Sequence, residues 1–119
     1  MDLIIGGAYQ GKLDYARESF GLTDSDICLC TPDAAPSPDC RCWYHYEQYV
    51  LGCLRRGESP VLPVRPDAVV IADDIFCGVV PLDAEARLWR EETGRALTAL
   101  AKAADSVTRL FCGLPLKLK

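Results

Sequence analysis

Short apolar runs that end at turn-forming or acidic residues recur along the chain. Leu3-Ile4-Ile5, residues 27–30 and residues 69–72 are apolar throughout, which predicts three strands, the first of them buried. Residues 107–112 and 114–118 are further strand material, arranged around the Gly-Leu-Pro turn at 113–115. The segments between these runs have a different periodicity.

Three intervening segments are predicted to be helices. Residues 12–20 precede Gly21, a natural helix end. A second helix precedes Gly57 and includes one apolar face, formed by Trp43, Tyr46, Val50, Cys53 and Leu54. The longest runs from Asp83, a capping residue, to Ala104, and its apolar stripe consists of Leu97, Leu100, Ala101 and Ala104. On that helix, the spacing of Arg87, Glu91 and Arg95 predicts two ion pairs.

Two segments, 32–40 and 58–67, contain three prolines each and are predicted as loops, because proline fits neither a helix interior nor a central strand. The order of elements is then β-α-β-loop-α-β-α-β. This order predicts an α/β fold, with a mostly parallel sheet and helices on both faces. With 119 residues, the chain is expected to form one domain.

Charge and composition narrow the function classes. The net charge of −4 is unlike that of a nucleic-acid-binding surface. No run is long enough to span a membrane, and residues 1–5 lack an export signal, so we expect a cytoplasmic protein without a membrane partner. The seven cysteines are then expected to be reduced, and most to act as small core residues.

The stretch GGAYQGKL at residues 6–13 has the spacing of a phosphate-binding loop. It lies between the first predicted strand and helix, where backbone N–H groups and the helix N-terminus can surround an anion. The predicted nucleotide-binding residues are Gly6, Gly7, Ala8, Tyr9, Gln10, Gly11, Lys12 and Leu13. A glycine-rich structural turn is the alternative interpretation.

Leu13 departs from the phosphate-loop pattern. A Ser or Thr at this position normally provides a hydroxyl ligand to Mg²⁺, and a leucine side chain cannot do so. The backbone cradle and Lys12 do not depend on that hydroxyl. We therefore expect binding of a nucleoside triphosphate, and we expect Mg²⁺-assisted transfer to suffer.

The carboxyl-terminal half resembles one known family. Residues 69–119, VVIADDIFCGVVPLDAEARLWREETGRALTALAKAADSVTRLFCGLPLKLK, look like the end of the bifunctional adenosylcobinamide kinase / adenosylcobinamide-phosphate guanylyltransferases of cobalamin biosynthesis. Asp73-Asp74 stand where that family has Asn-Glu, and residues 78–81 match its Gly-Ile-Val-Pro. Further matches along the helix and its exit are Arg87, Arg90, Gly94-Arg95 and Ala103-Ala104-Asp105-x-Val107.

The amino-terminal end resembles the same family, whose start reads GGARSGKS-x-x-AE. The matching positions are Gly6-Gly7-Ala8, Gly11-Lys12 and Tyr15-Ala16-Arg17. The resemblance implies a reduced P-loop fold of RecA-like type that binds ATP or GTP and adenosylcobinamide, often as a homotrimer. It also implies a transferase, a kinase or a nucleotidyltransferase.

The family is considerably longer in its centre. The missing part holds the histidine that accepts GMP and an acidic residue near the metal. A shortened enzyme is therefore one hypothesis. The alternative is a nucleotide-binding or regulatory module that has lost Mg²⁺-dependent turnover.

A few further residues are candidates for the chemistry. His45, the only histidine, is the candidate acceptor of GMP, although we expect it on a helix surface. Asp74 is a catalytic candidate, and Asp39 and Asp74 are candidate metal ligands. Cys40-x-Cys42-x-x-His45 is an alternative zinc motif, but Cys-x-Cys on a strand also simply places two small residues on one face.

Overall fold

Six strands form one sheet in the order β2-β3-β4-β1-β5-β6 in the computed structural model, which describes residues 1–119. The strands are β1 (Asp2–Gly6), β2 (Ile27–Leu29), β3 (Cys42–Tyr44), β4 (Val69–Asp73), β5 (Ser106–Phe111) and β6 (Leu114–Lys117). All neighbouring pairs are parallel except β5 and β6, which form an antiparallel hairpin. The predicted α/β class and mostly parallel sheet are confirmed.

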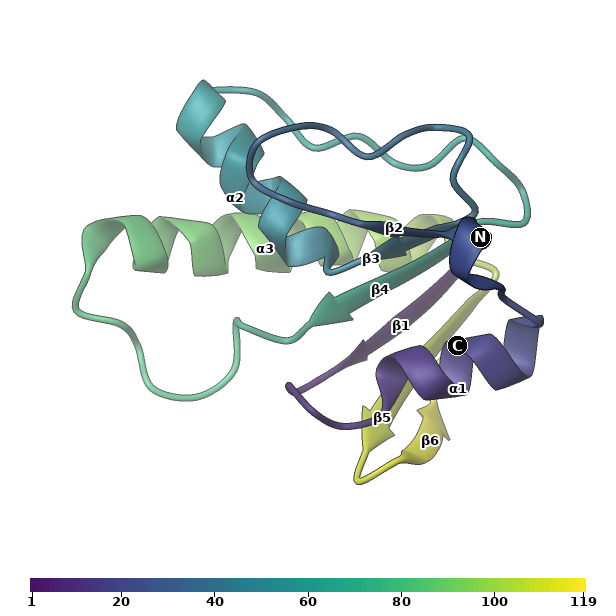
Figure 1. The fold of residues 1–119 in the computed structure, drawn as a ribbon. Coiled ribbons are helices and arrows are strands. Elements are labelled where there is room, and N and C mark those ends of the chain that lie inside the picture. Colours follow the sequence, from purple (N-terminus) through teal and green to yellow (C-terminus); the bar gives the residue numbers. More distant parts are fainter.

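Helices cover both faces of this sheet (Figure 1). Helix α1 (Lys12–Phe20) lies on one face, and α2 (Tyr46–Arg56) and α3 (Ala84–Ala103) lie on the other. A short 3-10 turn, η1 (Asp24–Asp26), precedes β2. None of the helices is long and apolar enough to cross a membrane.

The two central strands bury both of their faces. Leu3 of β1 is in register with Val70 of β4, and both belong to the larger core beneath α2 and α3. Their neighbours Ile4 and Ile71 face the smaller core beneath α1. This arrangement explains why these strands are continuous apolar runs rather than alternating ones.

The prediction of a helix that includes Trp43 was wrong. Cys42–Tyr44 form strand β3 between β2 and β4, and α2 begins only at Tyr46. Trp43 fits the apolar face of the predicted helix because it contacts the same core as Tyr46. The two rings stack there, with centroids 6.2 Å apart. One core thus receives side chains from a strand and from the helix after it.

The helix ends follow the sequence signals. Gly21 and Gly57 end α1 and α2 in the left-handed conformation. The Asp83 carboxylate accepts a hydrogen bond from Ala86 N at 2.9 Å and caps α3.

The predicted ion pairs from Glu91 to Arg87 and Arg95 are wrong. Arg87 instead donates to the Leu82 carbonyl, and Arg95 pairs with Glu92. Arg90 donates to three carbonyls of the segment between β4 and α3, those of Phe76, Gly78 and Val79. The carbonyls of this turn thus bind the guanidinium groups of Arg87 and Arg90, whereas Arg95 pairs with a carboxylate on the same helix.

Two helical glycines provide a matched test of this packing. An added Cβ at Gly52 of α2 would overlap the Pro32 backbone, whereas at Gly94 of α3 the nearest atom lies 3.9 Å away. We expect Gly52→Ala to lower the free energy of unfolding by about 1–3 kcal/mol. Gly94→Ala should raise it by up to about 1 kcal/mol, because alanine favours helices. Urea denaturation measures both, and an unaffected Gly52→Ala protein would contradict the packing of α2 on the 32–40 loop.

Candidate functional site

A pocket of about 540 Å³ opens at the carboxyl edge of the sheet, over the glycine-rich loop. Strands β1, β3 and β4 end there, and α1 starts there. Its lining consists of Ala8, Tyr9, Gln10, Gly11, Lys12, Leu13, Asp14, Tyr44, His45 and Asp73. A larger, mainly apolar groove of about 820 Å³ beside α3 contains none of the loop residues. The smaller pocket is therefore the candidate site.

The loop follows a defined backbone path. Gly6 approaches β5 so closely that an added Cβ would lie 2.6 Å from the Leu110 carbonyl oxygen. Gly11, the N-cap residue just before α1, has φ 85°, in the region that favours glycine. Between them, the Gln10 carbonyl accepts a hydrogen bond from Gly113 N at 3.0 Å. The β5–β6 turn is therefore hydrogen-bonded to the loop.

Lys12 is buried at the base of this pocket. Its Nζ atom donates to the Gly7 carbonyl at 2.6 Å and lies 2.7 Å from Asp73 Oδ1. The side chain of Lys12 is only 5% exposed. Asp73 Oδ1 is itself buried and accepts no hydrogen bond of good geometry, so the ion pair is its main compensation. The Lys12 cation thus has a carboxylate as its neutralising partner.

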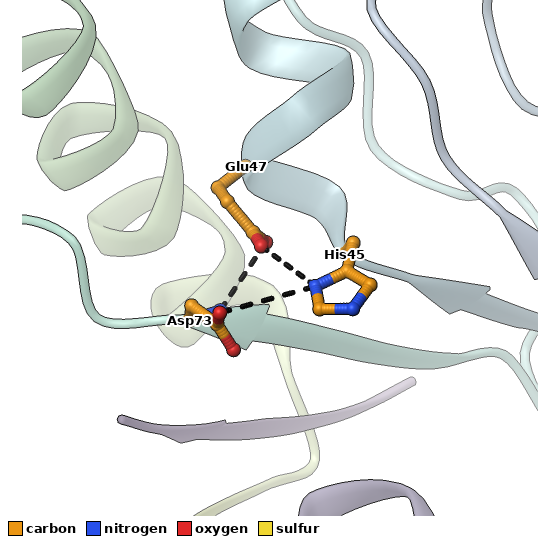
Figure 2. Close-up of side chains that lie close together, drawn as sticks. All are labelled: His45, Glu47 and Asp73. Atoms are coloured by element: carbon orange, nitrogen blue, oxygen red, sulfur yellow. Dashed lines mark hydrogen bonds and ion pairs between the residues drawn. The ribbon is translucent and has the colours of Figure 1, made fainter. Parts of the chain in front are cut away.

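Figure 2 shows His45 and Glu47 gathered beside Asp73, the residue that pairs with Lys12. His45 lies in the turn between β3 and α2, with φ 62°, and not on a helix surface as expected. Its Nδ1 atom is 2.8 Å from Glu47 Oε1 and 4.0 Å from Asp73 Oδ2. In the tautomer with the proton on Nδ1, His45 donates this hydrogen bond to the Glu47 carboxylate, which as an anion only accepts.

Glu47 is an acid inside the core, only 2% exposed. Its Oε2 atom accepts a hydrogen bond from Asp73 N at 3.2 Å, and its backbone carbonyl accepts one from Trp89 Nε1 at 2.7 Å. Burial raises the pKa of Glu47, the hydrogen bond from His45 opposes this shift, and the charge of Asp73 adds to it. Sequence reasoning missed Glu47, although a lone acid beside the apolar helix face was a usable signal.

The other predicted site residues lie apart from this cluster. Asp74 follows Asp73 but does not line the pocket, and its nearest cation is Arg109, at 3.7 Å. Asp39 is exposed in the loop before β3, at the amino edge of the sheet, where its carbonyl accepts from Arg65. The structure therefore places His45 in the pocket of the glycine-rich loop. Asp74 contacts the loop outside the pocket, where its N atom donates to the Gly6 carbonyl at 3.0 Å, whereas Asp39 does not line the pocket and lies in the loop before β3.

The ligands expected for a conventional Mg²⁺ or zinc site are not assembled. Leu13 packs against the core beneath α1 and offers no oxygen, so the residues present do not fit the usual Mg²⁺ site of a phosphate-binding loop. Cys42 is buried in that same core, whereas the Cys40 thiol donates to the Asp26 carbonyl. The ligand atoms that gather are those of His45, Glu47 and Asp73 alone.

Residues 49–118 match the sequence model of the cobinamide kinase / cobinamide phosphate guanyltransferase family. The match covers more than half of the chain. The chain belongs to this family. Membership supports the P-loop type of fold and a transferase role in cobalamin biosynthesis in general. No curated protein matched the chain in a separate comparison.

The family match begins within α2, at residue 49. It therefore includes β4, α3 and the β5–β6 hairpin, but few of the polar groups of the site. The glycine-rich loop, His45 and Glu47 all lie before it, and Asp73 lies within it. What these polar groups do is therefore argued from their geometry.

The buried carboxyl of Glu47 gives a prediction for pH. A carboxyl whose pKa is higher in the folded than in the unfolded chain reduces stability once the pH exceeds the unfolded value. We expect the free energy of unfolding, relative to that of Glu47→Gln, to fall as the pH rises above the ordinary value of 4.5. Urea denaturation of both proteins between acidic and neutral pH measures this difference. A difference that is constant with pH would contradict the raised pKa.

Proposed function

We propose that this protein binds ATP or GTP in the loop pocket and transfers part of it to a corrinoid, adenosylcobinamide or its phosphate. The observation that carries the proposal is the buried Lys12 ammonium, which lies at the base of an open pocket at a helix N-terminus. Family membership supports the reaction type and the corrinoid acceptor. A cytoplasmic location and a homo-oligomer, as in the family, remain predictions.

In the proposed complex, the triphosphate competes with Asp73 for Lys12. The N–H groups of the loop and the amino end of α1 bind the phosphate oxygens, and the Lys12 ammonium turns from the Asp73 carboxylate to the β- and γ-phosphates. Phosphoryl transfer depends mainly on positioning and charge neutralisation, which these groups supply. The corrinoid hydroxyl then replaces the nucleoside diphosphate at the γ-phosphorus.

His45 supports a second candidate function, GMP transfer. Its Nδ1–H is held by Glu47, so Nε2 is available in the pocket as a nucleophile. Attack of Nε2 on the α-phosphorus of GTP would form a P–N bond and release pyrophosphate. The corrinoid phosphate would then displace the imidazole and take up the GMP.

A nucleotide-binding or regulatory module without turnover is the alternative, and Leu13 favours it. Such a module would bind nucleotide through the loop and Lys12, and it would respond little to Mg²⁺. Incubation with ATP or GTP and adenosylcobinamide, followed by mass spectrometry of the corrinoid, separates the two. Transfer supports the enzyme, and nucleotide binding without any transfer supports the module.

Removal of the Lys12 ammonium tests the nucleotide site. We expect Lys12→Ala to weaken ATP or GTP binding by roughly 10- to 100-fold, the effect of a lost charge-assisted contact. Isothermal titration calorimetry measures the affinity. Lys102→Ala, on the exposed last turn of α3, is the matched control and should bind as the unmodified protein does.

Loss of Lys12 also leaves Asp73 without its partner, so stability has to be separated from binding. The double variant Lys12→Ala/Asp73→Asn removes both charges, and it should fold while still binding nucleotide weakly. Full affinity in either variant would refute the phosphate-binding role of the loop.

GMP transfer through His45 predicts a covalent intermediate. Incubation with GTP in the absence of a corrinoid should add one GMP residue to the intact mass, and the adduct should be acid-labile, as a phosphoramidate is. The His45→Ala variant should give no adduct. An adduct that persists in this variant, or none in the unmodified protein, would refute His45 as the acceptor.

A further inference from the structure

We propose that His45, Glu47 and Asp73 form a binding site for a divalent transition-metal ion such as Mn²⁺, Fe²⁺ or Zn²⁺. The role of this metal rests on the proposed function, because the ion would lie beside the nucleotide and compensate for the missing ligand at Leu13. Binding of the metal by itself does not depend on any nucleotide.

The geometry fits a metal ion between three elements. One ligand atom from each of the three residues lies within 4.8 Å of the other two. Ligands about 2.0–2.2 Å from an ion lie roughly 3–4 Å from one another. The Nδ1 atom of His45 already lies 2.8 Å from Glu47 and 4.0 Å from Asp73, so small side-chain movements would complete the site (Figure 2).

The type of ligand indicates the type of metal. Imidazole nitrogen suits Fe²⁺ and Zn²⁺, whereas carboxylate oxygens suit Mn²⁺ as well as Mg²⁺. A set of one imidazole and two carboxylates therefore fits a transition-metal ion. Two carboxylates add the charge that a divalent cation requires. One imidazole with two carboxylates also leaves coordination positions open towards the pocket, where phosphate oxygens could bind.

The supporting contacts hold the ligands in place before any metal arrives. Glu47 is fixed on one side by Asp73 N and on the other by the backbone contact of Trp89. His45 is placed by a turn with φ 62°, and Asp73 by the end of β4. Such contacts around a site set the orientation and affinity of its ligands.

Charge links this site to nucleotide binding. Without a ligand, the Lys12 ammonium at 2.7 Å compensates Asp73. If the Lys12 ammonium turns to a triphosphate, the carboxylates of Asp73 and Glu47 lose their neighbouring cation. A metal ion bound between them would then take the place of the ammonium. Metal and nucleotide would then strengthen each other's binding by the same factor.

Mn²⁺ titration followed by electron paramagnetic resonance tests the site without nucleotide. Mn²⁺ is the suitable probe because thiolates select softer metals, and the chain has seven free cysteines. We expect His45→Ala and Glu47→Gln each to weaken Mn²⁺ binding at least about 10-fold. Asp14→Asn, which removes an exposed carboxylate at the rim of the same pocket, should change the affinity less than twofold.

Circular dichroism verifies that the variants are folded. Because His45 is partly exposed and Glu47 is buried, His45→Ala is less prone to unfold than Glu47→Gln. Mn²⁺ affinity that His45→Ala leaves unchanged overturns the proposal. So does a GMP adduct on His45 in the Mn²⁺-loaded protein, because a metal on Nδ1 leaves the proton on Nε2 and removes the nucleophile.

Lys12→Met separates the metal site from the proposed function. It should tighten Mn²⁺ binding several-fold in the absence of nucleotide, because the competing ammonium is gone, and unchanged affinity would contradict the shared role of Asp73. If Mn²⁺ binds through His45 but no nucleotide binds, the metal site stands and the proposed function fails. If nucleotide binds but His45→Ala leaves the Mn²⁺ affinity unchanged, the metal site fails and the proposed function stands.

Discussion

The ion pair between Lys12 and Asp73 connects the glycine-rich loop to the centre of the sheet. Asp73 ends β4 in register with Gly6, the last residue of β1. The Lys12 ammonium, on the other side of the loop, pairs with the Asp73 carboxylate. Two central parallel strands therefore place one carboxylate opposite the first residue of α1. The loop, the end of β4 and the turn before α2 all depend on how this charge is compensated.

The side chains of His45, Glu47 and Asp73 provide polar groups near the loop, which lacks the usual hydroxyl at Leu13. Leu13 belongs to the core and contributes no hydroxyl, whereas His45 contributes an imidazole to the same pocket from the opposite side. Beneath it, Glu47 is buried and hydrogen-bonded to both neighbours. The proposed polyphosphate chemistry would depend on the charges of Lys12, Asp73 and Glu47 and on the imidazole, because negative charge must be balanced at each step.

The segment shared with the family mainly builds the frame of the site. Arginines of α3 hold the turn after β4 by its carbonyl oxygens, and the hairpin of β5 and β6 fixes the loop through Gln10. The polar groups at the pocket come mostly from the part of the chain before the matched residues. The fold therefore follows the family, while the chemistry of this chain depends on its own loop and on the turn at His45.

Local signals in the sequence were sufficient for most of the fold. The apolar runs of β1 and β4, the glycine ends of α1 and α2, and the Asp83 cap act within a few residues of chain, so the sequence alone determined these elements. The spacing of the glycine-rich loop also pointed to residues that line one side of the pocket, including Lys12, and their binding of phosphate stays a prediction.

The other half of the site was decided by tertiary structure. Strand β3 exists because Cys42 and Trp43 pair with Val69 and Val70, and a helical spacing in the sequence hides that pairing. Once β3 and β4 lie side by side, their carboxyl ends bring Glu47 to Asp73, 26 residues away along the chain. No local pattern encodes that contact, because the strand pairing that produces it joins distant segments through backbone hydrogen bonds that nearly all residue types can form.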